Sequence, residues 1–268
     1  MKKILIPTDF SSVADNATKY AFEIAAVFKS KLFLYHVYSM KKSDYDLNFS
    51  DENQPFKKKV KLKMNKTKEQ FNELLTEKNL TIKTKTYQGN IFSLFGRTVK
   101  KDGIGLVVMG SKGASGITKV IFGSVAGSAL EKSQVPLLVV PPEYTFQSLQ
   151  HIILAIDHKE ISPEVLSPLQ ELAAKFGAKV TILNIKTDSN NDIKTEKKVD
   201  LDGVEITYRE VPLSKNINNS INKFIEKENC DLLCMVRRKK SFFESIYKRS
   251  ITKNQVYNNQ VPLLVLPE

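Results

Sequence analysis

A nine-residue stretch in the middle of the chain returns almost unchanged at its end. Residues 134–142 read QVPLLVVPP and residues 260–268 read QVPLLVLPE, at an offset of 126 residues. The match extends back without a gap as far as Met109, which aligns with a second methionine. A repeat on this scale indicates that one structural unit occurs twice. We therefore expect two domains, residues 1–147 and residues 148–268.

The opening segment of each copy repeats as well, but at a different offset. ILIPTD at residues 4–9 returns as IILAID at residues 152–157, an offset of 148. The second copy is therefore about 22 residues shorter than the first between these two landmarks. We place the deletion between Lys186 and Gly203, where the second copy has only TDSNNDIKTEKKVDLD, a short helix or a loop, as the counterpart of the lysine-rich helix of the first.

Within the first copy, apolar runs alternate with amphipathic stretches. Runs such as LFLYHV are too uniformly apolar for a sheet that is solvated on one face, so helices should cover both faces. Strand and helix in alternation predict a doubly wound parallel sheet with right-handed crossovers. We expect strands at residues 3–7, 31–38, 81–87, 104–109 and 137–140, and helices at residues 13–28, 55–78, 91–101 and 124–133.

Three polar segments, TDFS, HVYS and MGSK, follow strands of this predicted sheet. Ligands of doubly wound sheets bind outside the carboxyl ends of the strands, so these segments should converge on one crevice. The last of them opens MGSKGASGITKVIFGS, residues 109–124, in which the glycine spacing is G-x2-G-x9-G-S. Gly110 and Gly113 would allow a tight turn and let backbone N–H groups approach an anion.

The end of the same stretch should begin the next helix, and a helix N-terminus attracts phosphate groups. Ser124 would cap this helix or contact the phosphate, and Lys112 would add a positive charge. The alternative is that the glycines serve turns alone. The sequence has no G-x4-G-K-[ST] loop and no G-x-S-x-G elbow, and the first strand–helix turn has no glycine.

The sequence contains little that indicates a catalytic or a metal-binding site. The three histidines have no evident Ser or Cys partner and show no metal-ligand spacing. We expect His36 to lie in the core and His158 to line the corresponding crevice of the second copy. No catalytic residue and no metal ligand is assigned, and whether the protein is an enzyme stays open.

The net charge of +12 is unevenly distributed, because residues 1–147 hold 23 Lys and Arg against 13 Asp and Glu. Many of these lysines lie in KKKVKLKMNKTK, residues 57–68, where apolar residues at helical spacing predict an amphipathic helix. The segment has no interleaved aromatic or Arg residues, so we expect a solvated face and no specific nucleic-acid partner, with weak attraction to polyanions left open. No apolar run could span a bilayer and no leader is evident, so a cytoplasmic protein is expected.

ILIPTDFS, the spacing G-x2-G-x9-G-S and the closing VPLLVV together resemble the universal stress protein family, and the two-copy layout resembles its tandem members. The resemblance implies five-stranded α/β domains of the adenine nucleotide alpha hydrolase-like fold. It also implies a stress-response protein that binds ATP or another adenine nucleotide, with or without Mg²⁺, and is regulatory rather than catalytic, with slow hydrolysis at most.

The residues that the resemblance assigns to the nucleotide share three positions in the fold. One group follows the first strand and would meet the nucleoside, one lies on the second strand at the adenine, and the third surrounds the glycines at the phosphates. They are Pro7, Thr8, Asp9, Val37, Met109, Gly110, Lys112, Gly113, Gly123, Ser124, Val125 and Ala126.

The second copy departs from this pattern, since Val236, Lys239 and Arg249 stand where the first has glycines. Each change adds a side chain where backbone should approach phosphate, so one nucleotide is expected per chain, in the first domain. The alternative is a nucleotide-free interaction module whose second domain binds a protein partner or a small apolar ligand. Its binding residues would be the aromatic side chains Phe242, Phe243 and Tyr247.

The terminal strands of the two copies are natural pairing edges. They run from Pro136 to Val140 and from Pro262 to Leu266, and in the resembling family this strand makes the dimer contact. The sequence therefore predicts an intra-chain pseudo-dimer or a homodimer through these strands, and it leaves the protein partner and the stress open.

Overall fold

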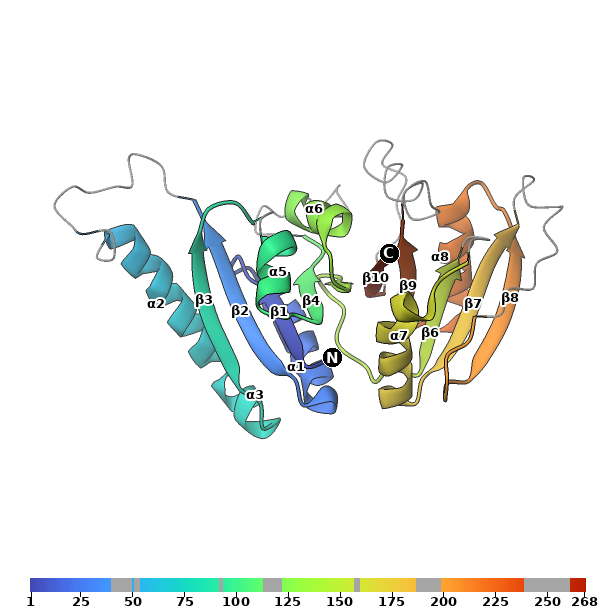
Figure 1. The fold of residues 1–268 in the computed structure, drawn as a ribbon, viewed down its shortest axis with the longest axis horizontal. Helices are drawn as coiled ribbons and strands as arrows, with labels where there is room; N and C mark the ends of the chain where they lie inside the picture. The colour runs from blue at the N-terminus through green and yellow to red at the C-terminus, as the bar shows by residue number, and fades with distance from the viewer. Residues whose placement is uncertain are drawn as a thin grey trace.

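Ten strands form one mixed sheet in the computed structural model of the protein (Figure 1). The structure describes residues 1–39, 50, 54–91, 94–112, 122–156, 160–186, 199–238 and 261–268. The strand order is β3-β2-β1-β4-β5-β10-β9-β6-β7-β8. The strands are β1 (Lys3–Pro7), β2 (Lys31–Tyr38), β3 (Ile82–Gln88), β4 (Leu106–Gly110), β5 (Leu137–Val140), β6 (His151–Ile156), β7 (Lys179–Lys186), β8 (Ile206–Pro212), β9 (Leu232–Arg237) and β10 (Leu263–Pro267).

The two halves of this sheet have the same internal order. We call β1 to β5 with their helices the first half, and β6 to β10 with theirs the second half. All strand pairs within each half are parallel, and in both halves the order counted from the half's own first strand is 3-2-1-4-5. The predicted doubly wound, five-stranded parallel arrangement is therefore confirmed for both.

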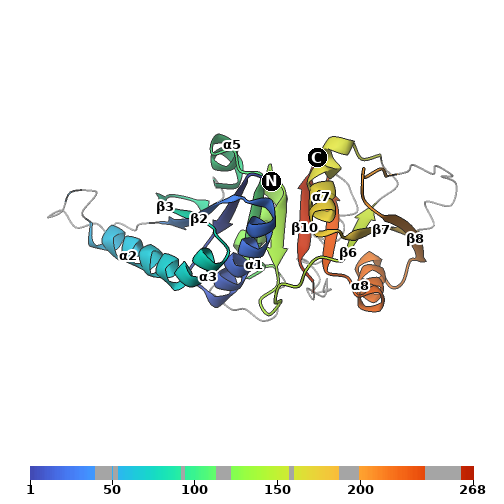
Figure 2. The same cartoon turned by 90° about the horizontal axis from the view of Figure 1, so that it is seen from below.

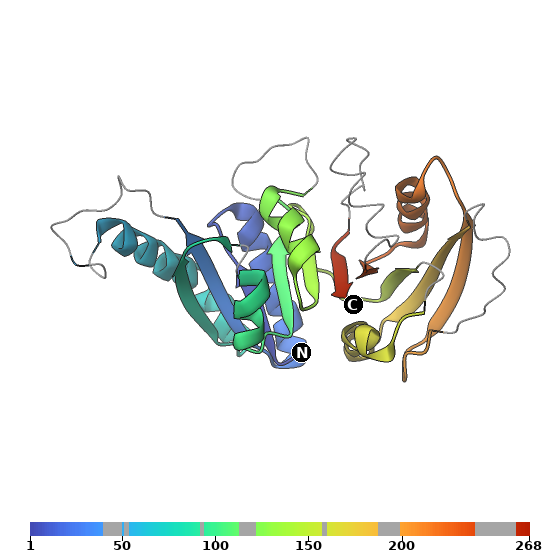
Figure 3. The same ribbon diagram turned by 45° about the horizontal axis from the view of Figure 1, so that its top comes forward.

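The halves join through β5 and β10, which pair antiparallel, with Leu263 opposite Val139 and Val265 opposite Leu137. Figures 1 and 3 show the C-terminal strand in the middle of the molecule, between the two halves. The chain is thus its own pseudo-dimer, and the two five-stranded sheets continue into one another as a single sheet.

Helices cover the sheet on both faces. Figure 2 shows α1, α2 and α3 on one side of the first half's strands and α5 on the other. The helices are α1 (Ser12–Phe28), α2 (Pro55–Gln70), α3 (Asn72–Glu77), the π-turn η3 (Leu94–Thr98), α5 (Val99–Lys101), α6 (Ser124–Lys132), α7 (Pro163–Phe176) and α8 (Ile217–Glu228). No helix in the described part of the chain combines the length and the apolar composition needed to cross a membrane.

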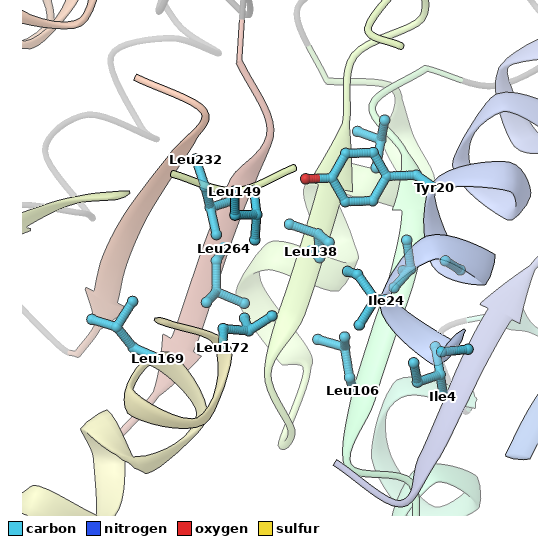
Figure 4. Close-up of a cluster of buried hydrophobic side chains, with 14 of the residues drawn as sticks. Ile4, Tyr20, Ile24, Leu106, Leu138, Leu149, Leu169, Leu172, Leu232 and Leu264 are labelled. Atoms are coloured by element: carbon cyan, nitrogen blue, oxygen red, sulfur yellow. The ribbon is translucent and has the colours of Figure 1, made fainter. Parts of the chain in front are cut away.

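Strand side chains alternate between two buried apolar clusters. On β4, for example, Leu106 and Val108 belong to the cluster beneath α1 and α7, whereas Val107 and Met109 belong to the cluster beneath α6 and α8. The first of these clusters crosses the junction between the halves, as Figure 4 shows for side chains that include Leu138 of β5 and Leu264 of β10. A shared core therefore supports the short β5·β10 pairing.

Two predicted helices differ from the observed ones. The helix expected over residues 55–78 breaks at Phe71, whose amide donates to carbonyls of Lys68 and Glu69 instead of continuing the α-helical pattern. Just before the break, the Thr67 hydroxyl donates to the Lys63 carbonyl, a local bond that bends helices. The helix expected over residues 91–101 contains the π-turn η3.

Several predictions fall outside the described residues. They concern Gly113, His158, the side chains that replace glycines at Lys239 and Arg249, the aromatic residues Phe242, Phe243 and Tyr247, and residues 187–198 of the predicted deletion.

Candidate ligand-binding site

A cavity of about 290 Å³ lies at the carboxyl ends of β1, β2 and β4, where α6 begins. Because the chain passes from β1 to β2 on one side and later to β4 on the other, this is the switch point of the first half. The cavity is lined by Pro7, Thr8, Asp9, Ala14, His36, Val37, Ile91, Met109, Gly110, Lys112, Gly123, Ser124, Val125 and Ala126.

The structure brings together all the predicted site residues that it describes. Eleven of the twelve line this one cavity, and the twelfth, Gly113, lies outside the described residues. They come from three separate parts of the chain, the turn after β1, the end of β2, and the segment from β4 to α6.

Hydrogen bonds within the turn after β1 hold its shape. The Thr8 hydroxyl accepts a bond from the Phe10 amide at 3.0 Å, and the Asp9 carboxylate accepts one from the Ser11 amide at 3.1 Å. Ser11 then caps α1 by accepting from the Ala14 amide. Phe10 takes a φ of 64°, which is unfavourable for a residue with a Cβ, so the surrounding bonds stabilise a strained backbone.

His36 is a cavity residue, and its predicted place in the core is wrong. The side chain is half-buried, with Nδ1 2.8 Å from the Thr8 carbonyl oxygen and the ring 4.3 Å from that of Phe10. Burial lowers the pKa of His36, and the positive charge of Lys63 adds to this, while the Thr8 carbonyl and Asp9 oppose it. Because a carbonyl oxygen can only accept, the Nδ1–H donates this bond to Thr8.

Gly110 has a reason to be glycine that differs from the predicted one. A Cβ at this position would lie 2.6 Å from Cγ1 of Val13 and 3.1 Å from the Val13 carbonyl oxygen. The close contact is therefore between β4 and the first turn of α1. By permitting it, Gly110 places Ala14 of α1 in the cavity wall.

The first turn of α6 forms another wall of the cavity. Gly123 is the N-cap, with φ of −60°, and it accepts the first helical bond, from the Gly127 amide. The amides of residues 124–126 precede that bond, and such first-turn N–H groups have no partner within a helix. Ser124 is the first helical residue, so its predicted role as the cap is wrong, since Gly123 holds that position with its amide bonded to Ser111.

Three lining residues were not predicted, and each had a signal in the sequence. Ala14 belongs to the helix that follows the first polar turn, His36 is the neighbour of Val37, and Ile91 begins a predicted helix after the third strand. All three positions follow from the rule that carboxyl ends of parallel strands share one edge. Ile91 and Val37 add apolar surface to the cavity, whereas the first turn of α6 contributes polar N–H groups.

No three His, Cys, Asp or Glu side chains among the described residues are grouped so as to hold a metal ion. The described lining therefore combines apolar side chains, one lysine, one carboxylate and backbone amides that have no partner within their own helix. This mixture fits a ligand with an apolar planar part and an anionic part.

The far end of α6 is held by the second half. Arg237, on β9, donates through Nη1 to the Leu130 carbonyl at 3.1 Å and through Nη2 to the Ser133 carbonyl. Both carbonyls belong to the last turn of α6, where helix carbonyls lack partners. A guanidinium of the second half thus caps the helix whose first turn lines the cavity of the first half.

The position that corresponds to the cavity lysine makes contacts within the protein in the second half. At the offset of 126, Lys112 corresponds to Arg238, whose side chain is 7% exposed. Its Nε lies 3.1 Å from a carboxylate oxygen of Glu268, and its Nη2 donates to the Glu160 carbonyl at 3.0 Å. The arginine therefore ties the end of β9 to the segment before α7.

A doubly wound parallel sheet with a cavity at the switch point defines an α/β ligand-binding protein of the nucleotide-binding kind in architecture. The sequence model of the universal stress protein family matches residues 1–141, more than half of the chain. The chain belongs to this family.

Two relatives from Methanocaldococcus jannaschii align with about half of the chain. Universal stress protein MJ0531 is 28% identical over 149 residues, covering 52% of this chain and 81% of that protein. Universal stress protein MJ0577 is 29% identical over 156 residues, covering 52% of this chain and 94% of that protein.

A solved structure resembles the whole chain. The crystal structure of a universal stress protein from Archaeoglobus fulgidus has a TM-score of 0.66 at 17% identity, covering 99% of this chain and 98% of that one. At this identity the likeness shows a shared fold, and it extends over both halves.

Proposed function

We propose that this chain is a stress-response protein that binds one adenine nucleotide in the cavity of the first half and acts as a regulator rather than an efficient enzyme. The observation that carries the proposal is the convergence of segments distant in sequence on one cavity, with the first turn of α6 forming its wall. Membership of the universal stress protein family supports the same ligand class.

The lining divides into parts that suit the parts of a nucleotide. Val37, Ile91 and Met109 offer apolar surface for a purine ring, and the exposed Asp9 carboxylate can accept bonds from ribose hydroxyls. The first-turn amides of α6, which have no partner within the helix, and the Lys112 ammonium would hold the phosphates. A volume of about 290 Å³ lies at the lower end of the range for small-molecule sites, which suits a mononucleotide.

We base the regulatory role on the hydrogen bonds that hold the ionisable groups of the described lining. The Asp9 carboxylate accepts from Ser11, and His36 is engaged by the Thr8 carbonyl through Nδ1. Both groups are held by the turn after β1, so a ligand that contacts them acts on the conformation of that turn. Binding would fix the turn after β1 and the start of α6.

We further propose that residues 1–147 and residues 148–268 are two copies of one domain and that the second does not bind the nucleotide. The identical strand order in the two halves supports the duplication. The buried Arg238, bonded to Glu160 and paired with Glu268, supports the loss of the site in the second copy.

Isothermal calorimetry of the full chain with ATP and Mg²⁺ tests the proposal. We expect saturation at one site per chain, once a denatured sample has been checked for nucleotide carried through purification. Gly123→Arg copies the residue found at this position in the second copy, and its side chain would enter the phosphate region. Affinity should fall by more than tenfold, because a bulky group displaces the ligand from the amides of α6.

Gln147→Arg is the matched control, since it adds the same charge at an exposed position away from the cavity. It should leave the affinity unchanged. No binding by the wild-type chain, with no carried nucleotide, would contradict the proposal and favour an interaction module without nucleotide. Equal binding by Gly123→Arg would place the nucleotide elsewhere.

A further inference from the structure

The helix α2 carries a strong positive charge. Its sixteen residues include seven lysines and one acidic residue, Glu69. Val60 and Met64 bury the apolar face of the helix against the fold, which leaves most of the lysines exposed. Figure 1 shows α2 beside β3, the outermost strand of the first half, so this charge faces away from the junction.

A row of aromatic rings adjoins this helix. The ring of His36 lies 4.3 Å from that of Phe10 and 6.3 Å from that of Tyr38, and the ring of Tyr38 lies 5.7 Å from that of Phe56 on α2. All four side chains are half-buried, so each keeps part of its surface accessible. Phe56 stands just before the lysines of α2, and the fold adds the other three rings from the turn after β1 and from the end of β2.

The rings and the lysines meet along one flank of α2. Phe56, Lys59 and Lys63 occupy positions i, i+3 and i+7, which lie on one side of a helix. Phe56 contacts the Tyr38 ring, and Nζ of Lys63 lies 5.7 Å from the centre of the Phe10 ring. This flank, which we call the aromatic flank, therefore faces the row. Lys58 and Lys61 point in other directions, since each residue turns the helix by about 100°.

We propose that the aromatic flank and the ring row bind single-stranded nucleic acid, with the lysines on the phosphates and the rings stacked against bases. Positive charge that follows a backbone, combined with aromatic side chains for the bases, is the arrangement by which proteins bind single strands without sequence preference. The proposal does not depend on a mononucleotide in the cavity.

Two other anionic partners fit the observations less well. A duplex hides the faces of its bases, so it would use the lysines and leave the rings without a role. An anionic membrane would require exposed apolar side chains beside the lysines. The apolar face of α2 is buried in the fold, and the exposed Leu62 belongs neither to the ring row nor to the aromatic flank.

Fluorescence anisotropy with a labelled ten-nucleotide oligo(dT) tests the proposal at 100 mM salt and above. We expect Lys59→Glu/Lys63→Glu to weaken binding at least tenfold and to lower the salt slope by about 1.4, because each lost phosphate contact removes about 0.7. Lys58→Glu/Lys61→Glu makes the same change of charge on the same helix and should weaken binding less than threefold. Equal effects of the two pairs would overturn the proposal.

A second measurement reports on the bases. The chain has no tryptophan, so Phe56→Trp places a single emitter in the ring row. Oligo(dT) should quench its emission, whereas inorganic polyphosphate of equal charge should not, and Phe56→Ala should weaken oligo(dT) binding at least fivefold. Binding without quenching, polyphosphate binding as tight as that of oligo(dT), or binding to phosphatidylserine vesicles but not to oligo(dT) would each overturn the proposal.

Discussion

At the end of β4, Gly110 lets the first turn of α1 lie against the strand, whereas at the end of β9 the corresponding residue is the buried Val236. The helix that faces it, α7, begins at Pro163, three residues later than the offset of 148 from the start of α1 would place it. The two halves thus have the same strand order but differ at the carboxyl edge of their strands. The residue at the end of the strand and the start of the facing helix therefore both differ between the halves.

The other differences lie at the same edge. The position of the cavity lysine holds Arg238, which is buried and bonded to the segment before α7. The position of Ser111 holds Arg237, which reaches into the first half and caps α6. The sheet is thus the same in both halves, whereas three neighbouring positions at the end of β4 and β9 differ in the contacts that they make.

Among the variants that test this difference between the halves, Gly110→Ala should have the largest effect. Its Cβ would stand 2.6 Å from Val13, so either α1 moves or the strand is strained, and overpacking of this kind costs about 1–3 kcal/mol of unfolding free energy. Gly105→Ala is the matched control, because its Cβ would have no neighbour nearer than 3.7 Å. Urea denaturation measures both. Equal stability of the two variants would mean that α1 does not need a glycine opposite it.

Arg237→Ser, which copies the first half's Ser111, should have the next largest effect. It removes two hydrogen bonds from a guanidinium to the last turn of α6, a loss of about 1–2 kcal/mol for a half-buried charged donor. Amide hydrogen exchange near the C-terminus of α6 should accelerate. Arg209→Ser, on the exposed face of β8, is the control and should change neither quantity. Unchanged exchange in α6 would show that Arg237 does not hold the helix.

His36→Asn, which copies Asn184 of the second half, should have the smallest effect, visible as a change of pH dependence. Burial first, and Lys63 with it, lower the pKa of His36 in the folded chain. Below about pH 6.5 the unfolded chain therefore binds more protons, and stability falls as the pH drops from there to the folded pKa. The variant should lose this part of the decline. An identical stability–pH curve for both proteins would exclude His36 as its source.

Most of the fold could be predicted from the sequence, because its signals are local. The apolar runs predict the strands, and the repeat of QVPLLV at residues 134–139 and residues 260–265 predicts two similar units whose terminal strands pair, as β5 and β10 do. The three segments that line the cavity could be grouped in advance because the carboxyl ends of parallel strands share one edge, and the resemblance to the family supplied the individual residues.

The features that were missed depend on contacts between distant segments. The requirement for Gly110 comes from Val13 on another element, and the place of His36 depends on the Thr8 carbonyl and the Phe10 ring. The ring row next to α2 likewise joins segments from three elements. No pattern along one segment contains such information, since it arises only when the sheet is assembled.

The antiparallel pairing of β5 with β10 also frees the chain from a symmetry constraint. In a homodimer, the two sides of such an interface are identical, so every substitution appears twice and must suit both places. Here the two sides belong to one polypeptide. An arginine at position 237 can therefore cap a helix across the junction while a serine remains at position 111, and each side of the interface is able to evolve alone.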